Sequence, residues 1–222
     1  MGVTEGRTTV HGQAGGDSLF ALLGGRRGAL DASAPPAAFV VGWLLGGNSI
    51  AIGAAAAVGV GLLIGVFRLV RGGKVGAVLV SLAAVCAAAL IALYTGRAQD
   101  FFLLQLLLNG ASALAWAASI VLRWPLLGVV VGFALGQKNR WRRDPALLRA
   151  YGRASWVWVL GQYLLRVLVY GALWWAGEVV ALGVARVALS WPLVAAVIAV
   201  SAWVLRKALP EGHPGLRSPQ SS

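Results

Sequence analysis

The chain has 222 residues, of which 59% are hydrophobic and only 12% are charged, and its formal net charge is +12. A soluble domain carries about 25% charged residues, and half that share cannot cover a globular surface. This composition excludes an ordinary soluble domain and indicates a membrane protein. The basic residues are scattered among apolar runs without a recognition motif, which favours cytoplasmic loops over nucleic-acid binding.

A polar tail, residues 1–34, precedes the first long apolar run. Residues 1–17 are Gly-rich and lack an apolar core directly behind a basic start, so they are predicted to be disordered and are not a signal peptide. Residues 18–30 mix Leu and Phe with two arginines, a pattern that fits an interfacial helix and a linker equally well. The tail holds three acids and three arginines, so its charge assigns it to neither side of the membrane.

The predicted membrane domain covers residues 35–206 and has the pattern of an all-α, polytopic helical bundle. Five apolar runs reach the roughly 20 residues of a transmembrane helix. These full spans are expected at residues 50–67, 75–94, 100–125, 155–176 and 179–205. Two shorter runs, 35–47 and 125–136, each begin at a proline and are predicted to be half-helices, because about 11 residues give only roughly 17 Å of helix. Residues 207–222 are predicted to be a disordered C-terminal tail.

Charge in the loops predicts the topology. The loops at 68–74 and 137–153 and the pair Arg206-Lys207 are basic, whereas the loops at 95–100 and 177–178 are neutral or acidic. The positive-inside rule therefore puts the basic loops and the C-terminus in the cytoplasm. The Ala/Gly/Arg-rich composition is compatible with a GC-rich bacterial genome, so we expect a multi-pass protein of a bacterial plasma membrane. Within the second basic loop, Asp144-Pro145 has the N-cap and N1 pattern of a helix start.

Two short segments resemble each other. Residues 40–46 (VVGWLLG) and 130–136 (VVGFALG) are each followed by two predicted spans. The loop charges give those two pairs of spans opposite orientations. Paired short helices in inverted halves are typical of transporters with a binding site near the midplane. Chance similarity in a chain rich in Ala, Gly and Val explains the same pattern.

Polar residues form a stripe on three of the predicted spans. In the span 100–125 they recur at steps of four and three residues, which places them on one helix face. Polar faces in a bilayer turn toward other helices, and a central Arg such as Arg166 costs ~2.5–3.5 kcal/mol on insertion scales. Packing all three stripes inward gives one candidate polar interior, made of Gln105, Asn109, Ser112, Gln162, Arg166, Tyr170, Arg186 and Ser190.

Two interpretations of this interior remain open. In the first, it is a hydrated cavity that opens outward and has a positive floor for an anion or an acidic lipid headgroup. In the second, Arg166 and Arg186 only hold the bundle together, with Asp100 and Glu178 as ion-pair candidates and Tyr170 and backbone carbonyls as further partners. The loop residues Trp141, Arg142 and Arg143 likewise fit contact with anionic lipid or plain positive-inside topology.

The sequence offers no constellation for catalysis. Cys86 is the single cysteine, and His11 and His213 lie in the two tails. No paired carboxylates, metal-ligand spacing, nucleophile–base pair or phosphate-binding loop occurs. We therefore expect no metal, no cofactor and no enzymatic activity.

Several motifs occur in a fixed order: GRAQDFF at 96–102, Asn109, RWPL at 123–126, WRRDP at 141–145 and RAY at 149–151. Together they resemble an actinobacterial integral membrane family of unknown function, over residues 24–209. A looser similarity is to the intracellular septation protein A family. It rests on a short Pro-led first helix, a basic loop, an acidic-aromatic outer loop and the closing Pro210-Glu211. The longer N-terminal tail and the higher Trp and Arg content set this chain apart from that second family.

The septation family is associated with maintenance of the cell envelope and septum, and the resemblance implies a related role without supplying catalytic residues. We therefore expect a non-enzymatic envelope protein that acts through helix-face contacts with lipids or membrane partners. The alternative is a small transporter or channel for an anion or an acidic lipid headgroup. The expected partners are the bilayer, anionic phospholipid headgroups and other membrane proteins or a second copy of the chain, with no nucleic acid.

Overall fold

The computed structural model describes residues 25–134, 142 and 144–208. Every regular element in these ranges is a helix. Five helical stretches of the described chain are long and apolar enough to cross a membrane, namely Ile50–Val70, Val75–Thr95, Ala98–Val121, Pro145–Trp175 and Trp191–Ala208. The prediction of an all-α, multi-pass membrane protein is therefore confirmed.

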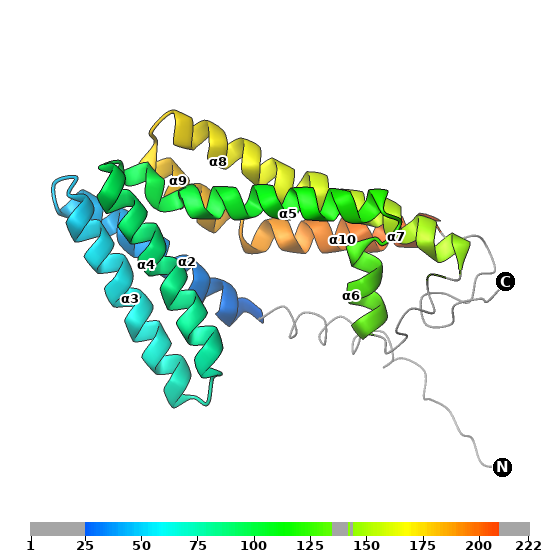
Figure 1. Cartoon of the computed structure of the whole chain (residues 1–222), viewed down its shortest axis with the longest axis horizontal. Coiled ribbons are helices and arrows are strands. Elements are labelled where there is room, and N and C mark those ends of the chain that lie inside the picture. Colours follow the sequence, from blue (N-terminus) through cyan, green and yellow to red (C-terminus); the bar gives the residue numbers. More distant parts are fainter. Residues whose placement is uncertain (1–24, 135–141, 143, 209–222) are drawn as a thin grey trace, which may run out of the picture.

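The helices form two groups that meet at one end and diverge toward the other (Figure 1). The first group comprises α2 (Gly25–Leu45), α3 (Ile50–Val70) and α4 (Val75–Thr95). The second group comprises η1 (Ala98–Phe102), α5 (Leu103–Val121), α6 (Leu126–Ala134), α7 (Pro145–Val157), η3 (Trp158–Leu164), α8 (Leu165–Trp175), α9 (Val179–Ala188) and α10 (Trp191–Ala208). We call the shared end the apex; it carries the turns at 46–49, 96–97 and 176–178.

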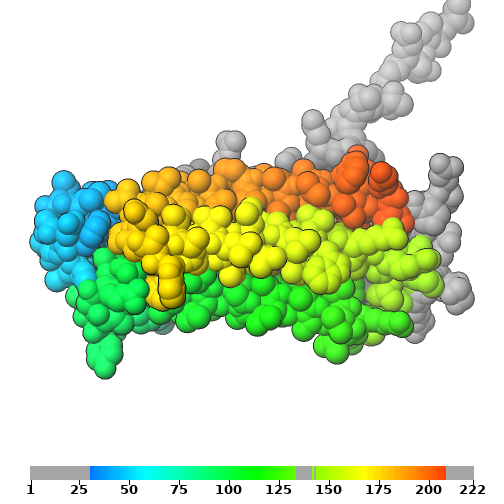
Figure 2. Space-filling model, turned by 90° about the horizontal axis from the view of Figure 1, so that it is seen from above, coloured from blue at the N-terminus to red at the C-terminus, as the bar shows by residue number. Residues whose placement is uncertain are grey.

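Within the second group, α5, the continuous stretch from α7 to α8, and α10 lie side by side, as Figure 2 shows from above in green, yellow and orange. The stretch Pro145–Trp175 has 31 residues, or about 46 Å of helix, and contains a π-helical turn over Trp158–Leu164. Its start confirms the predicted cap, because Asp144 Oδ1 accepts hydrogen bonds from the backbone N–H groups of Ala146 at 2.9 Å and Leu147 at 3.2 Å. The unusual length of this helix carries it past the predicted span into the basic loop.

Close backbone approach joins α2 to α3. A Cβ added at Gly42 would lie 2.7 Å from Ala56 Cβ, and one added at Gly53 would lie 2.9 Å from the Phe39 carbonyl oxygen. The turn between the helices uses positive φ angles at Gly47 and Asn48, a conformation that Gly and Asn adopt most readily. Small residues at a membrane helix interface permit this kind of contact, which gains dispersion energy in place of a hydrophobic driving force.

The prediction of a Pro-led half-helix at 35–47 is wrong, because α2 begins ten residues earlier and runs through Pro35 and Pro36. A proline inside a helix removes one N–H bond to the carbonyl four residues back. Pro36 leaves the Ala32 carbonyl without its helical donor. The helix continues here, and this carbonyl accepts a hydrogen bond from Arg186 Nη2 at 3.5 Å. Residues 25–34, assigned above to the polar tail, are thus helical, and residues 1–24 lie outside the described chain.

The prediction of one span over 179–205 is also wrong. The chain breaks at Leu189–Ser190 into the ten-residue α9 and the 18-residue α10. Pro192 falls in the first turn of α10, where a missing N–H costs no helical bond. The second predicted half-helix is confirmed as the nine-residue α6. Because α2 has 21 residues and α6 has nine, the proposed inverted halves begin with helices of very different length.

Two apolar clusters stabilise the bundle. The cluster near the apex joins both groups through Phe39, whose ring stacks on that of Phe101 with centroids 4.0 Å apart, while Phe102 packs edge-on. The second cluster lies toward the far end of the second group around Leu147, Tyr151 and Leu205. This apolar core around Phe39 is therefore the part of the structure that holds the two helix groups together.

The glycine contact between α2 and α3 predicts a selective effect of one methyl group. Gly53→Ala is expected to lower the free energy of unfolding in detergent by about 1–3 kcal/mol, because its Cβ would meet backbone that cannot move aside. Gly59→Ala, in the same helix with open space at its Cβ position, is the control and should change it by less than about 1 kcal/mol. Thermal unfolding measures both variants, and equal effects would contradict the close contact.

Candidate functional site

A half-open cavity of about 240 Å³ lies where the two helix groups diverge, and we call it the crevice. Its walls come from α2, α3 and α4 on one side and from η1, α5 and α9 on the other. The apolar lining includes Val85, Ala88, Phe101, Leu104 and Leu108, and the polar lining consists of Asp31, Arg68, Ser81, Gln105 and Arg186. The crevice therefore combines an apolar wall with two guanidinium groups and one carboxylate.

The two arginines contact consecutive residues of α2 from two different helices. Arg68, in the last turn of α3, has its Nε 3.9 Å from Asp31 Oδ2, and both side chains are partly exposed. Arg186, on α9, donates to the Ala32 carbonyl at the 3.5 Å contact described above. Both contacts are long, because charge-assisted N–H···O bonds are typically about 2.7–2.9 Å. Neither guanidinium is held tightly by its partner on α2.

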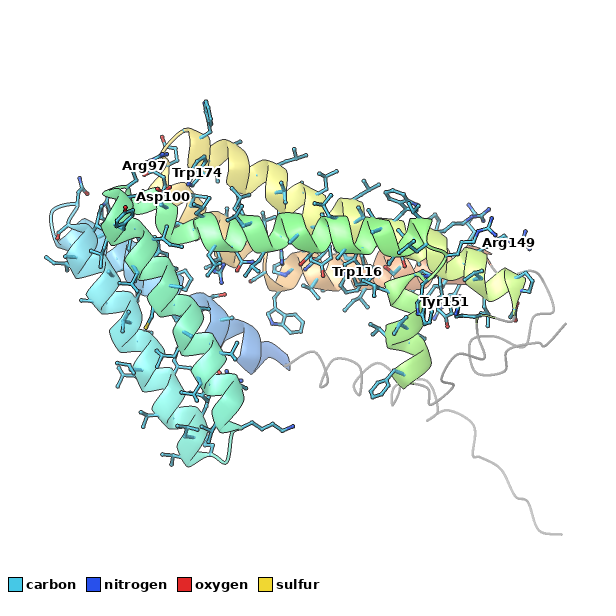
Figure 3. The ribbon with its side chains drawn as sticks, viewed as in Figure 1. Arg97, Asp100, Trp116, Arg149, Tyr151 and Trp174 are labelled. Carbon is cyan, nitrogen blue, oxygen red and sulfur yellow. The ribbon has the colours of Figure 1, made fainter. Side chains whose placement is uncertain are left out.

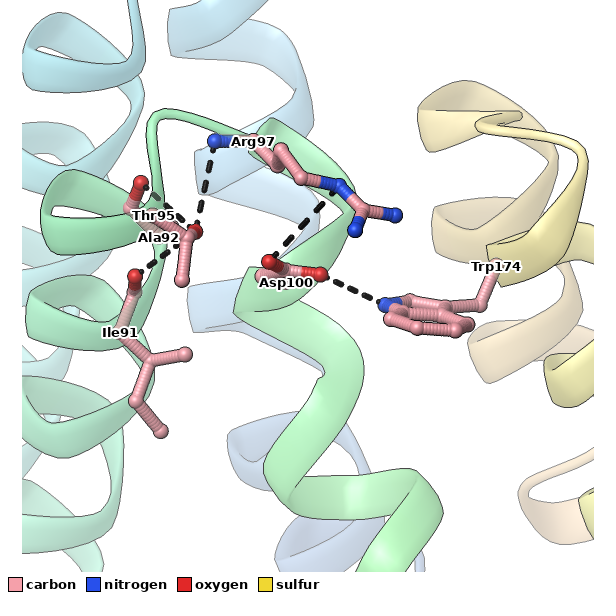
Figure 4. Close-up of polar contacts among 6 residues, drawn as sticks. All are labelled: Ile91, Ala92, Thr95, Arg97, Asp100 and Trp174. Carbon is pink, nitrogen blue, oxygen red and sulfur yellow. Dashed lines mark hydrogen bonds and ion pairs between the residues drawn. The ribbon is translucent and has the colours of Figure 1, made fainter.

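A polar group that we call the apex cluster, made of Arg97, Asp100 and Trp174, lies at the apex, outside the lining of the crevice. Trp174 Nε1 donates to Asp100 Oδ1 at 2.8 Å, and Arg97 Nε lies 3.9 Å from Asp100 Oδ2 (Figure 4). The Arg97 guanidinium also lies over the Trp174 ring, 5.0 Å from its centroid. Figure 3 shows the three side chains converging from the α4–η1 turn and the end of α8. Asp100 is 97% buried and joins the two elements.

Arg166 lies away from the crevice and holds the break between α9 and α10. Its Nε and Nη2 both donate to the Leu189 carbonyl, the former at 3.0 Å, and Nη2 also donates to the Ser190 carbonyl at 3.2 Å. A helix end leaves such carbonyls without intrahelical partners. Asp100 pairs with Arg97, and Glu178 is exposed at the apex. Backbone carbonyls, not these acids, are thus the partners that the structure shows for Arg166.

The predicted polar interior is brought together in part. Arg166 bonds to the Ser190 carbonyl and lies near enough to Tyr170 and Arg186 for electrostatic interaction, whereas Asn109, Ser112 and Gln162 lie elsewhere. Asn109 is buried and donates from Nδ2 to the Gln105 carbonyl at 2.7 Å, within its own helix. Ser190 Oγ donates to the Val187 carbonyl at 2.6 Å, and Ser112 is half-buried on α5. Tyr170 belongs to the apex core, and Gln162 is buried in the π-helical turn, where its Oε1 has no partner among the described residues. Of the predicted set, the structure brings Gln105 and Arg186 together in the crevice wall.

Sequence reasoning missed Asp31, Arg68 and Ser81 as crevice residues. Asp31 fell in the assumed tail, and Arg68 counted only as a loop charge for topology. The double proline that follows Asp31 was taken as a helix start, although a proline pair inside a helix also marks freed carbonyls that need donors. The apex cluster had one usable signal, since Arg97 and Asp100 are three residues apart beside an aromatic pair.

The basic ends of the helices carry cation–aromatic pairs. The Arg142 guanidinium lies 4.0 Å from the ring centroid of Trp124, and Lys207 Nζ lies 5.2 Å from that of Trp203. Such amphipathic pairs suit the headgroup region of a bilayer. Trp141 and Arg143, the other two predicted lipid contacts, lie outside the described residues. No group of three metal-ligating side chains occurs in the part of the chain that the structure describes.

The apex cluster predicts a large difference between two neighbouring tryptophans. Trp174→Phe is expected to lower the free energy of unfolding by about 1–3 kcal/mol, because buried Asp100 loses its indole donor. Trp175→Phe removes the same group from a side chain that is 85% exposed, and should have little effect. Thermal unfolding of both variants in one detergent tests this, and a stable Trp174→Phe protein would contradict it.

Arg166 is predicted to stabilise the α9–α10 break. Arg166→Met keeps the length of the side chain but leaves the Leu189 and Ser190 carbonyls without their donor, so it should cost about 1.5–3 kcal/mol. It should also speed amide hydrogen exchange in the turn after the break. Arg149→Met, on an exposed position of the same long helix, is the control and should change stability by less than about 0.5 kcal/mol. Unchanged exchange in Arg166→Met would contradict the capping role.

Comparison with known proteins identifies one family. No match to the chain was found among curated proteins or among solved structures. A family model described as a protein of unknown function, DUF3159, matches residues 23–212. This range contains the crevice, the apex cluster and every helix of the structure. The chain is therefore a member of the DUF3159 family of proteins of unknown function.

Proposed function

We propose that this membrane protein is non-enzymatic and acts by binding anionic lipids through the crevice and its flanking helix faces. The observation that carries the proposal is the lining of the crevice, in which two weakly held guanidinium groups lie beside an apolar wall. A phosphate headgroup matches guanidinium in charge and geometry. An acyl chain matches the leucine and phenylalanine surface, so one amphiphilic ligand satisfies both parts of the lining.

The size of the crevice supports partial entry of the ligand. Pockets that enclose a drug-sized molecule measure about 300–1,000 Å³, and the crevice has about 240 Å³. A whole lipid does not fit, whereas a headgroup with the first part of a chain does. The rest of the lipid would lie against the exposed apolar faces of α4 and α5, in the bilayer. Partial entry of this kind favours a lipid over a compact soluble anion.

The orientation of the protein is part of the proposal. Arg68, Arg71 and Lys74 end the first helix group, and Arg206 and Lys207 end the second, all away from the apex. The positive-inside rule puts these ends and the C-terminus in the cytoplasm. The crevice then widens toward the cytoplasmic leaflet, where anionic lipids attract basic segments. The resemblance to septation proteins adds a role in the envelope of a bacterial cell, with the plasma membrane as the site.

Lipid binding is predicted to depend on the crevice wall. Leu108→Trp, which narrows the crevice, should reduce the amount of phosphatidylglycerol retained by the purified protein at least about threefold. Leu114→Trp places the same bulk on an exposed face of the same helix outside the crevice and should retain the wild-type amount. Native mass spectrometry after exchange into neutral detergent measures the retained lipid. Equal retention of phosphatidylglycerol and phosphatidylcholine by the wild type would overturn the proposal.

A transporter for an anion or an acidic lipid headgroup is the second candidate. The shape of the crevice favours it, because Phe101, which stacks on Phe39 in the core that joins the two helix groups, lies in the wall of the cavity toward the apex. A cavity closed at one end and open at the other is the arrangement that alternating access requires. Flux of a fluorescent phosphatidylglycerol between leaflets of proteoliposomes separates the two candidates, because a binding protein retains lipid without accelerating its transfer.

A further inference from the structure

We infer that Asp31 occupies the headgroup subsite of the crevice in the empty protein and competes there with the phosphate of an anionic lipid, which binds between Arg68 and Arg186. This inference rests on the proposed lipid binding. It adds the residues that bind the headgroup and the carboxylate that lowers the affinity for it. The juxtaposition that carries it is the pair of arginines reaching consecutive residues of α2 from two other helices.

The two guanidinium groups lie on two helices that face the same cavity. Arg68 approaches the Asp31 carboxylate and Arg186 approaches the Ala32 carbonyl, while both side chains line one cavity. The Cα atoms of consecutive residues are about 3.8 Å apart. Because both guanidinium groups belong to the lining of one cavity of about 240 Å³, we infer that one ligand bound in the crevice contacts both.

The two guanidinium groups are weakly neutralised in the crevice. Asp31 Oδ2 is 3.9 Å from Arg68 Nε, and both side chains are more than a third exposed. An exposed ion pair of this geometry contributes little, since solvent screens it. Arg186 has a neutral carbonyl as its partner in place of a carboxylate. Two cations thus share one carboxylate, and the site retains an unbalanced positive charge.

The double proline of α2 leaves backbone acceptors free beside the two arginines. Pro36 cannot donate to the Ala32 carbonyl, and Pro35 cannot donate to that of Asp31. Both prolines line the crevice together with the two residues whose carbonyls they free. Ala32 thus presents to Arg186 a carbonyl that Pro36 leaves free, while Asp31 presents its side-chain carboxylate to Arg68. A lipid phosphodiester carries the same single negative charge as this carboxylate, so we infer that it takes the place of a partner held at 3.9 Å.

The inference predicts that removing the competitor strengthens binding. Asp31→Asn should bind short-chain phosphatidylglycerol about two- to fivefold more tightly than the wild type, the range expected for release of an exposed ion pair. Glu178→Gln removes the same charge from an exposed acid at the apex and should leave the affinity unchanged. Native mass spectrometry of the full chain in neutral detergent gives the dissociation constants.

Variants of the arginines complete the test. Arg68→Gln should weaken phosphatidylglycerol binding at least about threefold, whereas Arg71→Gln, whose guanidinium lies 4.0 Å over the Phe67 ring, serves as its control on the same helix end. In the Arg68→Gln background, adding Asp31→Asn should have no further effect, because the competitor then has no partner to release. Melting temperatures identify any variant that is unfolded. The folded variants still test whether Asp31 competes with the lipid phosphate for Arg68.

The possible outcomes separate the two proposals. If the wild type prefers phosphatidylglycerol to phosphatidylcholine but Asp31→Asn binds no more tightly than Glu178→Gln, the competitor role is overturned and the proposed lipid binding stands. If the wild type shows no preference between the two lipids, the proposed function itself fails. If Asp31→Asn gains affinity for inorganic phosphate and not for phosphatidylglycerol, the site takes a free anion, and the lipid assignment is overturned.

Discussion

Two arginines inside the helical body donate to backbone carbonyls that irregular helices leave free, and the arrangement of the second helix group depends on them. A bilayer offers no water to such carbonyls, so each one needs a donor from the protein. Arg166 supplies it at the break after α9, and Arg186 supplies it at the double proline of α2. Guanidinium suits this task because it has five donors and stays charged in an apolar setting.

These contacts also determine where the crevice lies. Arg186 ties α9 to α2, so the two helix groups are joined near the apex and at the level of Ala32. Between these two contact points α4 packs closely against η1 but diverges from α5. The two walls of the crevice are therefore separated there. The double proline of α2 thus requires Arg186 as a donor for the Ala32 carbonyl. The other N–H donors of the same guanidinium remain available to the crevice. A structural role and a binding role are compatible in Arg186, which donates to the Ala32 carbonyl and also lines the crevice.

The sequence predicts the helical class well, because span length and apolar composition are local properties. Span ends were predicted to within a few residues at Ile50, Val75 and the start of η1. The two wrong helix boundaries both come from the position assigned to a proline. The sequence pattern predicts Pro35 at a helix start, but it lies inside α2. The pattern predicts Pro192 inside a helix, but it lies in the first turn of α10. The position of Pro35 depends on Arg186, which donates to a carbonyl of α2 from far along the chain. The position of Pro192 depends on the break after α9. The local sequence pattern shows neither.

The polar interior was harder to predict, because helical spacing shows which residues share a face and not which faces meet. Gln105 and Asn109 do share a face, yet Asn109 bonds to its own helix and only Gln105 reaches the crevice. The other predicted residue in the crevice lining is Arg186 on α9, more than 80 residues away in the chain. Asp31 was placed outside the membrane domain, so the carboxylate nearest the site was left out of the prediction.

Charge balance explains why the site is positive. The described chain contains four acids, and the structure assigns three of them elsewhere: Asp100 to Arg97 and Trp174, Asp144 to the N-terminus of α7, and Glu178 to the exposed apex. Only Asp31 remains for the arginines of the crevice. A carboxylate on a partly exposed helix cannot neutralise two guanidinium groups, one of which already bonds to a neutral carbonyl. The positive charge of the crevice is therefore a consequence of how few acids the chain has and where folding places them, and it favours an anionic ligand over a neutral one.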